Sequence, residues 1–137
     1  MAPRKKYSQA FRSYVQKKVG LIRDRLWLGS WRIDIVWDAT PDEEDWTASI
    51  SADPQYLEAR VKIYDNLYAY WREGQREYIF SILMHEVCHI FQEPNWSRLR
   101  DRVSLVELIL MQDDHERCNS MVTRAVSGLF TKKDWER

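Results

Sequence analysis

The sequence predicts an α+β fold: an N-terminal helix, then a small, largely antiparallel three-stranded sheet, then two long helices. Three observations lead to this prediction. Apolar residues recur every three or four positions near the start of the chain, alternate with polar residues in its middle, and return to helical spacing in its second half. Because 137 residues suit one domain, we expect a single domain over residues 1–137, with a basic tail at about residues 1–7.

The first helix is expected over residues 9–26. Ser8 precedes it and is a residue type that caps helix N-termini. The apolar residues recur with the spacing of one helix face, and they are Phe11, Val15, Val19, Ile22 and Leu26. Gly29 and Ser30 then interrupt the helical pattern, so we expect the chain to turn there into the sheet.

Three strands are predicted where apolar and polar residues alternate, over residues 31–37, 46–52 and 57–63. The second and third runs are separated by the turn-forming sequence Asp-Pro-Gln at residues 53–55, which indicates an antiparallel hairpin. Residues 66–75 carry a weaker pattern, for which we expect a short helical turn that ends at a glycine. The sheet therefore lies between the two helical parts of the chain.

The first long helix after the sheet is predicted over residues 76–91, and Pro94 and Asn95 are expected to close it. Ile79 and Leu83 belong to one apolar stripe of this helix, and further apolar residues lie on the opposite side. We therefore expect the helix to be buried from both sides, with one side packed on the sheet.

The last helix is expected to begin at an S-x-x-E capping box formed by Ser104 and Glu107. Its apolar positions continue to Leu129, and Gly128 lies near its end. The apolar stripe rotates near residues 112–114. A single kinked helix and a division into two helices both remain open at that point.

Composition excludes several classes of protein. Apolar residues make up 45% of the chain, with only four Gly and four Pro, which argues against a disordered or fibrous chain. No apolar run approaches the roughly 20 residues that span a bilayer, and no secretory signal is visible, so we expect a cytoplasmic protein without a membrane partner. Cys88 and Cys118 are too few for a disulfide framework. We expect both to be reduced, with a single bridge between them as the alternative.

Charge is balanced overall but unevenly placed. Residues 1–25 carry eight Lys and Arg against one acid, whereas residues 26–70 carry three against nine. The first interpretation is a solvated helix face whose bases pair with the acidic middle of the chain. Attraction to nucleic acid or to a membrane surface is the alternative, and we do not expect it to be the main role.

Residues 85–89 read His-Glu-Val-Cys-His, an H-E-x-x-H motif in the middle of the strongest helical segment. Residues four apart on a helix differ by about 40° in direction and about 6 Å in rise, so His85 and His89 can bind one tetrahedral Zn²⁺. Glu86 lies beside the metal, where it can act as general base on a metal-activated water. The motif therefore predicts Zn²⁺ as cofactor, His85 and His89 as ligands, and Glu86 as the catalytic residue.

A third ligand is expected from the last helix. A metzincin would place a third histidine six residues after His89, but Asn95 stands there. The carboxylate candidates are Glu107, Asp113, Asp114 and Glu116, with His115 as a nitrogen alternative. The capping box already accounts for Glu107. Glu116 shares a helical face with apolar residues, which directs its carboxylate toward the interior, so we predict Glu116 as the third ligand.

Other polar residues have supporting roles in this hypothesis. His115 is either the alternative ligand or a donor to the oxyanion of the reaction intermediate. Asn119 and Asp113 lie three residues on either side of Glu116 and can orient the imidazole N–H groups. The alternative for Glu116 is an exposed place at the N-terminus of a second helix. Cys88, inside the motif, is interpreted as a packing residue.

With these residues the chain resembles the minimal zincin-fold metallopeptidases of the gluzincin type, particularly small proteins found in phages and prophages. The resemblance rests on the H-E-x-x-H motif after three strands and on the acidic helix around Glu116, over roughly residues 30–127. Repressor-cleaving peptidases related to ImmA and DNA-associated SprT-like proteases are more distantly similar. The chain lacks the third histidine of the SprT-like pattern and an attached helix-turn-helix. The resemblance implies that an extended peptide adds to an edge strand beside the active-site helix, and we expect residues 57–64 to be that strand.

The expected function is that of a zinc-dependent endopeptidase, which hydrolyses peptide bonds in a protein or peptide substrate. If the chain is phage or prophage encoded, it would act in the host cytoplasm. One alternative is a catalytically silent zincin-like protein or DNA-binding module with structural zinc, for which the basic first helix is the motivation. A metal-free helical interaction module is the remaining alternative.

Overall fold

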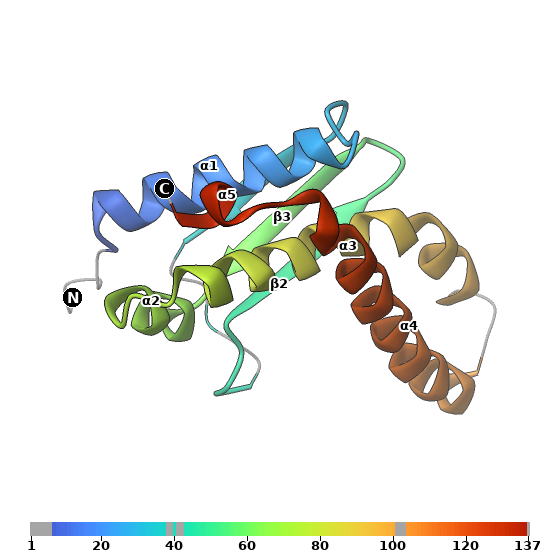
Figure 1. Cartoon of the computed structure of the whole chain (residues 1–137). Coiled ribbons are helices and arrows are strands. Elements are labelled where there is room, and N and C mark those ends of the chain that lie inside the picture. Colours follow the sequence, from blue (N-terminus) through green and yellow to red (C-terminus); the bar gives the residue numbers. More distant parts are fainter. Residues whose placement is uncertain (1–6, 38–39, 41–42, 101–103, 137) are drawn as a thin grey trace.

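The computed structural model describes residues 7–37, 40, 43–100 and 104–136, and for residues 91–100, 105–109 and 111 it describes the backbone alone. The elements are α1 (Gln9–Arg25), β1 (Arg32–Val36), β2 (Ala48–Asp53), β3 (Glu58–Ile63), α2 (Asp65–Arg72), α3 (Arg76–Arg100), α4 (Leu105–Val126), the 3₁₀ turn η1 (Ser127–Leu129) and α5 (Lys132–Glu136). This order confirms the predicted α+β class (Figure 1). Over the described residues, no helix combines the length and the apolar character that crossing a membrane requires.

The three strands form one sheet in the order β1-β3-β2. The expected hairpin is confirmed, because β2 pairs antiparallel with β3, with Ile50 opposite Val61. β1 pairs in parallel with β3, with Ile33 opposite Ala59, so the sheet is mixed rather than largely antiparallel. Alternation fixes which face a side chain occupies but not the direction of the neighbouring strand, which is why the sequence did not reveal the parallel pair.

The position of β3 corrects one expectation. We expected residues 57–64 to be the edge strand beside the active-site helix, but β3 has a neighbour on each side. The edge strand that contacts α3 is β2. Both backbone edges of β3 are occupied by ladder hydrogen bonds, so an added peptide has no place there.

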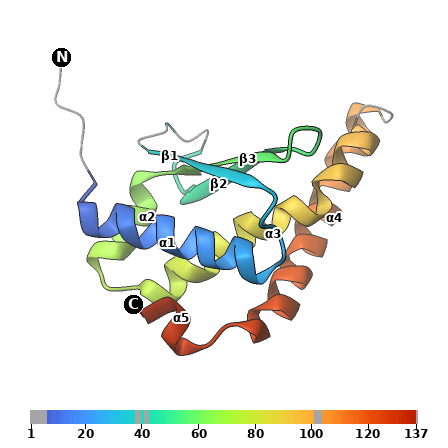
Figure 2. The ribbon, with the colours of Figure 1, turned by 90° about the horizontal axis from the view of Figure 1, so that it is seen from above.

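The sheet has one buried face and one exposed face. On β3 the buried residues are Ala59, Val61 and Ile63, and the exposed residues Glu58, Arg60 and Lys62 alternate with them. Figure 2 shows α1 and α3 on one side of the sheet and no helix on the other. The fold therefore has two layers, with its core between the sheet and these helices.

α1 follows its prediction closely. The hydroxyl oxygen of Ser8 accepts a hydrogen bond from the backbone N–H of Phe11 at 3.2 Å, which caps the helix start. The residues that α1 buries include four of the five in the predicted stripe, namely Phe11, Val15, Val19 and Ile22. The helix ends at Arg25, and Trp27 then adopts a positive φ of 57° as the chain turns toward β1.

The later helices differ from prediction in length. α3 continues to Arg100, past Pro94, where we expected it to end. A proline removes one backbone hydrogen bond of a helix, and this loss does not stop α3. α4 runs unbroken through residues 112–114, so neither a division nor a second helix start occurs there. The expected capping box at Glu107 lies outside the described side chains.

The C-terminal segment returns to the core as a strap over α1 and α3. The Tyr14 hydroxyl donates to the backbone carbonyl of Trp135, and the Arg25 guanidinium pairs with Asp134 at 2.6 Å. Burial is the main cause that raises the pKa of Tyr14 to about 12. These contacts tie the end that follows α4 to the first helix.

The basic residues of α1 are largely engaged within the molecule. Arg23 pairs with Asp24, and Arg25 pairs with Asp134 near the C-terminus, so these two arginines do not pair with the acidic middle of the chain as expected. The guanidinium of Arg12 lies 5.3 Å from the ring centroid of Trp37, and Lys18 is buried. Intramolecular contacts therefore use much of the positive charge that the sequence places on this helix.

Candidate metal centre

His85 and His89 lie on one side of α3, one helical turn apart. The opposite side of the helix packs into the core through Ile79, Leu83 and Val87, which are fully buried. The two imidazole rings have centroids 5.0 Å apart and are nearly perpendicular, at 89°. Their side chains are 28% and 11% exposed, so the core holds both rings while one side remains open.

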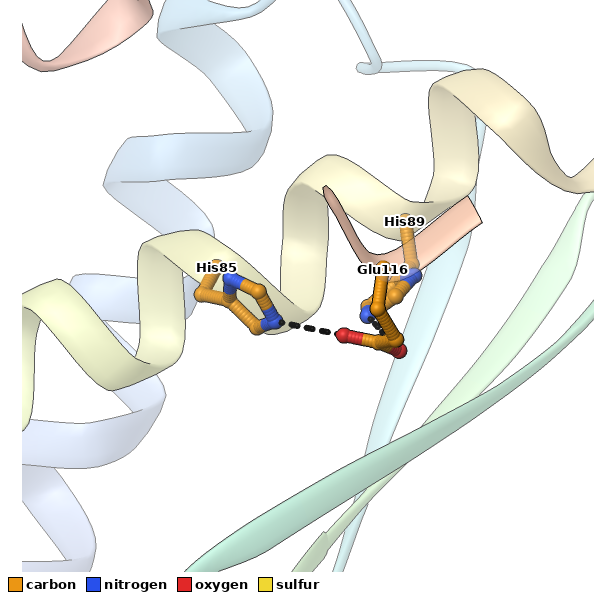
Figure 3. Close-up of side chains that lie close together, drawn as sticks. All are labelled: His85, His89 and Glu116. Atoms are coloured by element: carbon orange, nitrogen blue, oxygen red, sulfur yellow. Dashed lines mark hydrogen bonds and ion pairs between the residues drawn. The ribbon is translucent and has the colours of Figure 1, made fainter. Parts of the chain in front are cut away.

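Glu116 on α4 lies against both rings (Figure 3). Its Oε2 is 3.3 Å from His85 Nε2, and its Oε1 is 3.2 Å from His89 Nε2. The helical face predicted from the sequence points this carboxylate toward the interior, but the side chain is 54% exposed. The structure thus brings Glu116 to the two histidines, and the burial argument that selected it is wrong.

The donor atoms of these three residues lie close enough together to hold one metal ion. One ligand atom from each residue can be chosen so that all three lie within 4.8 Å of one another. Two imidazole nitrogens and one carboxylate oxygen also form a donor set that zinc accepts, with a fourth position left for water or substrate. The cluster can therefore hold a metal ion.

The electrostatics of the cluster favour an ionised carboxylate. Hydrogen bonds from His85 and His89 hold the pKa of Glu116 well below its ordinary value. The hydrogen bond to Glu116 in turn raises the pKa of His85, although burial opposes this shift. Metal binding requires a carboxylate without its proton, and Glu116 is in that state at neutral pH.

Glu86 borders the same site but is not part of the donor group. It lines a cavity of about 580 Å³ together with His89, His115 and Glu116. Burial raises the pKa of Glu86 to about 7, although the two histidines lower it. A carboxyl group with a pKa near neutrality can both accept and release a proton, which is what a general base and acid requires.

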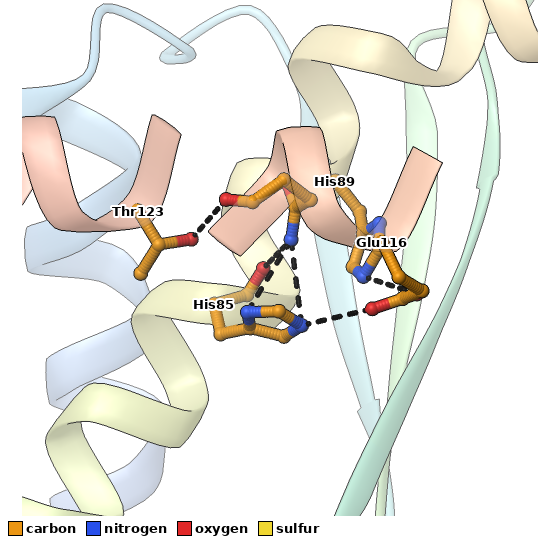
Figure 4. Close-up of polar contacts among 5 residues, drawn as sticks. His85, His89, Glu116 and Thr123 are labelled. Carbon is orange, nitrogen blue, oxygen red and sulfur yellow. Dashed lines mark hydrogen bonds and ion pairs between the residues drawn. The ribbon is translucent and has the colours of Figure 1, made fainter. Parts of the chain in front are cut away.

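Asn119 of α4 links the two helices by a hydrogen bond to His85 of α3, and Figure 4 shows the polar contacts around His85, Glu116 and Thr123. The side-chain Nδ2 of Asn119 donates to the backbone carbonyl of His85 at 2.9 Å and lies 3.5 Å from both ring nitrogens. Thr123 donates from Oγ1 to the Asn119 carbonyl at 2.8 Å. The shorter contact of Asn119 is thus with the backbone of α3, and its role in orienting an imidazole stays a prediction.

The Glu107 side chain lies outside the described residues, and the other candidates lie around this group rather than in it. His115 lines the cavity, with its ring centroid 5.3 Å from that of His89, and burial lowers its pKa. Asp113 and Asp114 are exposed, and Asp114 pairs with Arg117 at 3.6 Å. Cys88 is fully buried in the core, in agreement with its interpretation as a packing residue.

One part of the cavity lining was not predicted from the sequence. Residues 45–50, which lead into β2 and begin it, line the same cavity as Glu86 and Glu116. A correct strand order would have identified them, but the alternation pattern contains no information about that order.

Comparisons with family models, with curated proteins and with solved structures find no match to this chain. The geometry of the site must therefore support any functional conclusion by itself.

Proposed function

We propose that this protein is a zinc-dependent peptidase that cleaves peptide bonds in a protein or peptide substrate. The observation that supports this most strongly is the convergence of His85, His89 and Glu116 beside Glu86 on an open cavity. Two imidazoles and a carboxylate around one point, with a second carboxyl group next to them, match the requirements of metal-assisted hydrolysis.

Glu86 has the role of proton carrier in this proposal. Its carboxylate accepts a proton from the attacking water and then delivers it to the nitrogen of the leaving amine. Burial raises the pKa of Glu86, which makes its carboxylate a stronger base toward the proton of the water. A Zn²⁺ held by His85, His89 and Glu116 would polarise the scissile carbonyl and make water acidic enough to lose this proton.

The edge strand β2 offers a way to hold an extended substrate. In the part of the chain that the structure describes, β2 pairs only with β3, and its first residues line the cavity. A peptide that adds to this edge would satisfy the free backbone groups of Ala48–Asp53 and place one of its bonds beside Glu86. The geometry thus favours a peptide over a small molecule as substrate.

The decisive experiment is the Glu86→Gln variant. It removes the base but none of the three donors, so we expect zinc content unchanged and cleavage of a proteome-derived peptide library reduced at least a hundredfold. Glu77→Gln, an exposed change on the same helix, is the control and should retain full activity. Wild-type activity in Glu86→Gln would contradict the mechanism.

We do not propose a nucleic-acid-binding role. The charge on α1 that motivated it is partly engaged by Asp24, Asp134 and Trp37. DNA binding that weakens with salt and is unchanged in Glu86→Gln, in a protein that cleaves no peptide, would favour that alternative.

A further inference from the structure

A second hollow adjoins the metal cluster on the side of the N-terminal half of α3. Its volume is about 450 Å³, and it shares Thr47 and Glu86 with the first cavity. His85 belongs to its wall, together with Ser81 and Ile82 from the preceding turn of α3. The two hollows therefore lie on opposite flanks of the place where the proposed reaction occurs.

The two flanks differ in charge. Glu86 borders both hollows, and the first cavity adds the carboxyl groups of Asp45 and Glu116. In the second hollow, Arg124 is the single Lys or Arg among the described lining residues. Over the described residues no ion pair engages its guanidinium, whereas Arg117, seven residues earlier on α4, pairs with Asp114. Arg124 thus has its charge available to a ligand.

The other walls of the second hollow suit a side chain with an aliphatic stem and a polar end. Ile82 and Met84 supply apolar surface, and Ser120 and Thr123 supply hydroxyl groups next to Arg124. Glutamate has such a stem and ends in a carboxylate, which forms charge-assisted hydrogen bonds with a guanidinium. Lysine and arginine would meet a like charge there.

The course of β2 indicates which substrate residue reaches this hollow. The first cavity extends along β2 to Ile50, whereas the second touches only Thr47, just before the strand. A peptide that continued on the free edge of β2 the antiparallel pattern that β2 has with β3 would pass Ile50 before Thr47. The residue on the carboxyl side of the scissile bond therefore lies at the second hollow.

We propose that the hollow beside Arg124 selects a glutamate immediately after the scissile bond. This inference rests on the proposed peptidase function, since it names the substrate class of the same site. Arg124 is the specificity-determining residue. The carboxylates of the first cavity disfavour an acidic side chain on the amino side of the scissile bond.

The test uses two peptide probes that differ in one side chain. Each carries a hydroxamate-bearing acyl group at its amino end to bind the metal, followed by glutamate in one probe and glutamine in the other. Calorimetry on the zinc-loaded full chain should show about tenfold tighter binding of the glutamate probe, the worth of one charge-assisted contact. The preference should disappear or reverse in Arg124→Glu and persist in the control Arg117→Glu.

Equal affinities in the wild type, or an unchanged ratio in Arg124→Glu, would overturn the inference. Failure of the proposed function has a different signature. A chain that holds zinc and prefers the glutamate probe, yet cleaves no peptide, supports the hollow and contradicts the peptidase. A chain that holds no zinc fails in metal analysis before any probe is added, and both proposals then fall.

Discussion

The histidine pair and the carboxylate of the candidate metal site are held in different ways. His85 and His89 belong to the part of α3 that is packed on the core through Ile79, Leu83 and Val87. Glu116 belongs to α4, where Asn119 alone is fully buried among the side chains that the structure describes. Figures 1 and 2 show α4 at the side of the molecule, away from the sheet.

This difference indicates that the fold positions the two histidines independently of Glu116. The imidazole pair is fixed by core packing, so its geometry is present in any molecule that is folded. The carboxylate depends on how α4 meets α3, and the contact from Asn119 to the His85 carbonyl is a main polar link between them. We infer that the histidines provide the basic affinity and that Glu116 completes the site.

The largest loss of zinc affinity should come from a change in the histidine pair. His89→Ala removes a direct metal donor, so zinc affinity should fall by more than roughly 100-fold. Loss of a residue that only orients a ligand by a hydrogen bond lowers affinity by up to about that factor. Glu116→Ala should also weaken zinc, but less, since both imidazoles remain in place. Competition with a fluorescent chelator measures both values, and a smaller loss in His89→Ala than in Glu116→Ala would contradict the comparison.

The second-largest effect should come from Asn119, which links α4 to α3. Asn119→Ala removes the amide that donates to the His85 carbonyl, so we expect unfolding to become easier by about 1–3 kcal/mol. Zinc affinity should fall by roughly 10- to 100-fold, as for other contacts that orient ligands. Met121→Ala, an exposed change on the same helix, is the control. Unchanged zinc affinity in Asn119→Ala would show that α4 is positioned by other contacts.

The smallest effect concerns the strap that returns from α4 to α1. The hydrogen bond from Arg25 is the main cause that holds the pKa of Asp134 below its ordinary value. Its stabilising effect is therefore complete above the unfolded pKa, near 3.9, and is lost as the pH falls through the lower folded value. Asp134→Asn should reduce stability by about 1 kcal/mol at pH 7.

Denaturant melts from pH 7 down to pH 2 measure this prediction. The difference between wild type and Asp134→Asn should shrink at the acidic end, where the carboxyl group is protonated in both states. A difference that stays constant over this range would assign the effect to packing rather than to the ion pair.

The sequence predicted the part of the site that depends on local geometry. Helical spacing alone brings His85 and His89 to one face, with Glu86 beside them, so no knowledge of the rest of the fold was needed. Glu116 was predicted as a ligand from the helical face on which it lies, which also is a local property. The accompanying argument from burial was wrong. The α+β class followed from two changes of hydrophobic period along the chain, from helical spacing to alternation and back.

The parts that the sequence did not predict depend on contacts between distant segments. The parallel pairing of β1 with β3 leaves β2 at the edge, and an alternating pattern reads the same for either strand order. The extension of α3 past Pro94 was also not predicted, because proline is a local stop signal for helices. The cavity wall at residues 45–50 and the hollow at Arg124 both follow from these long-range features.

The central claim is that His85, His89 and Glu116 hold one divalent metal ion in the native chain. Mass spectrometry of the untagged protein under native conditions, supported by elemental analysis, measures this directly. We predict about one zinc per chain in the wild type and in Glu86→Gln, and loss of the metal in His89→Ala. A folded wild-type chain that carries no divalent metal, even after incubation with zinc, would contradict the account.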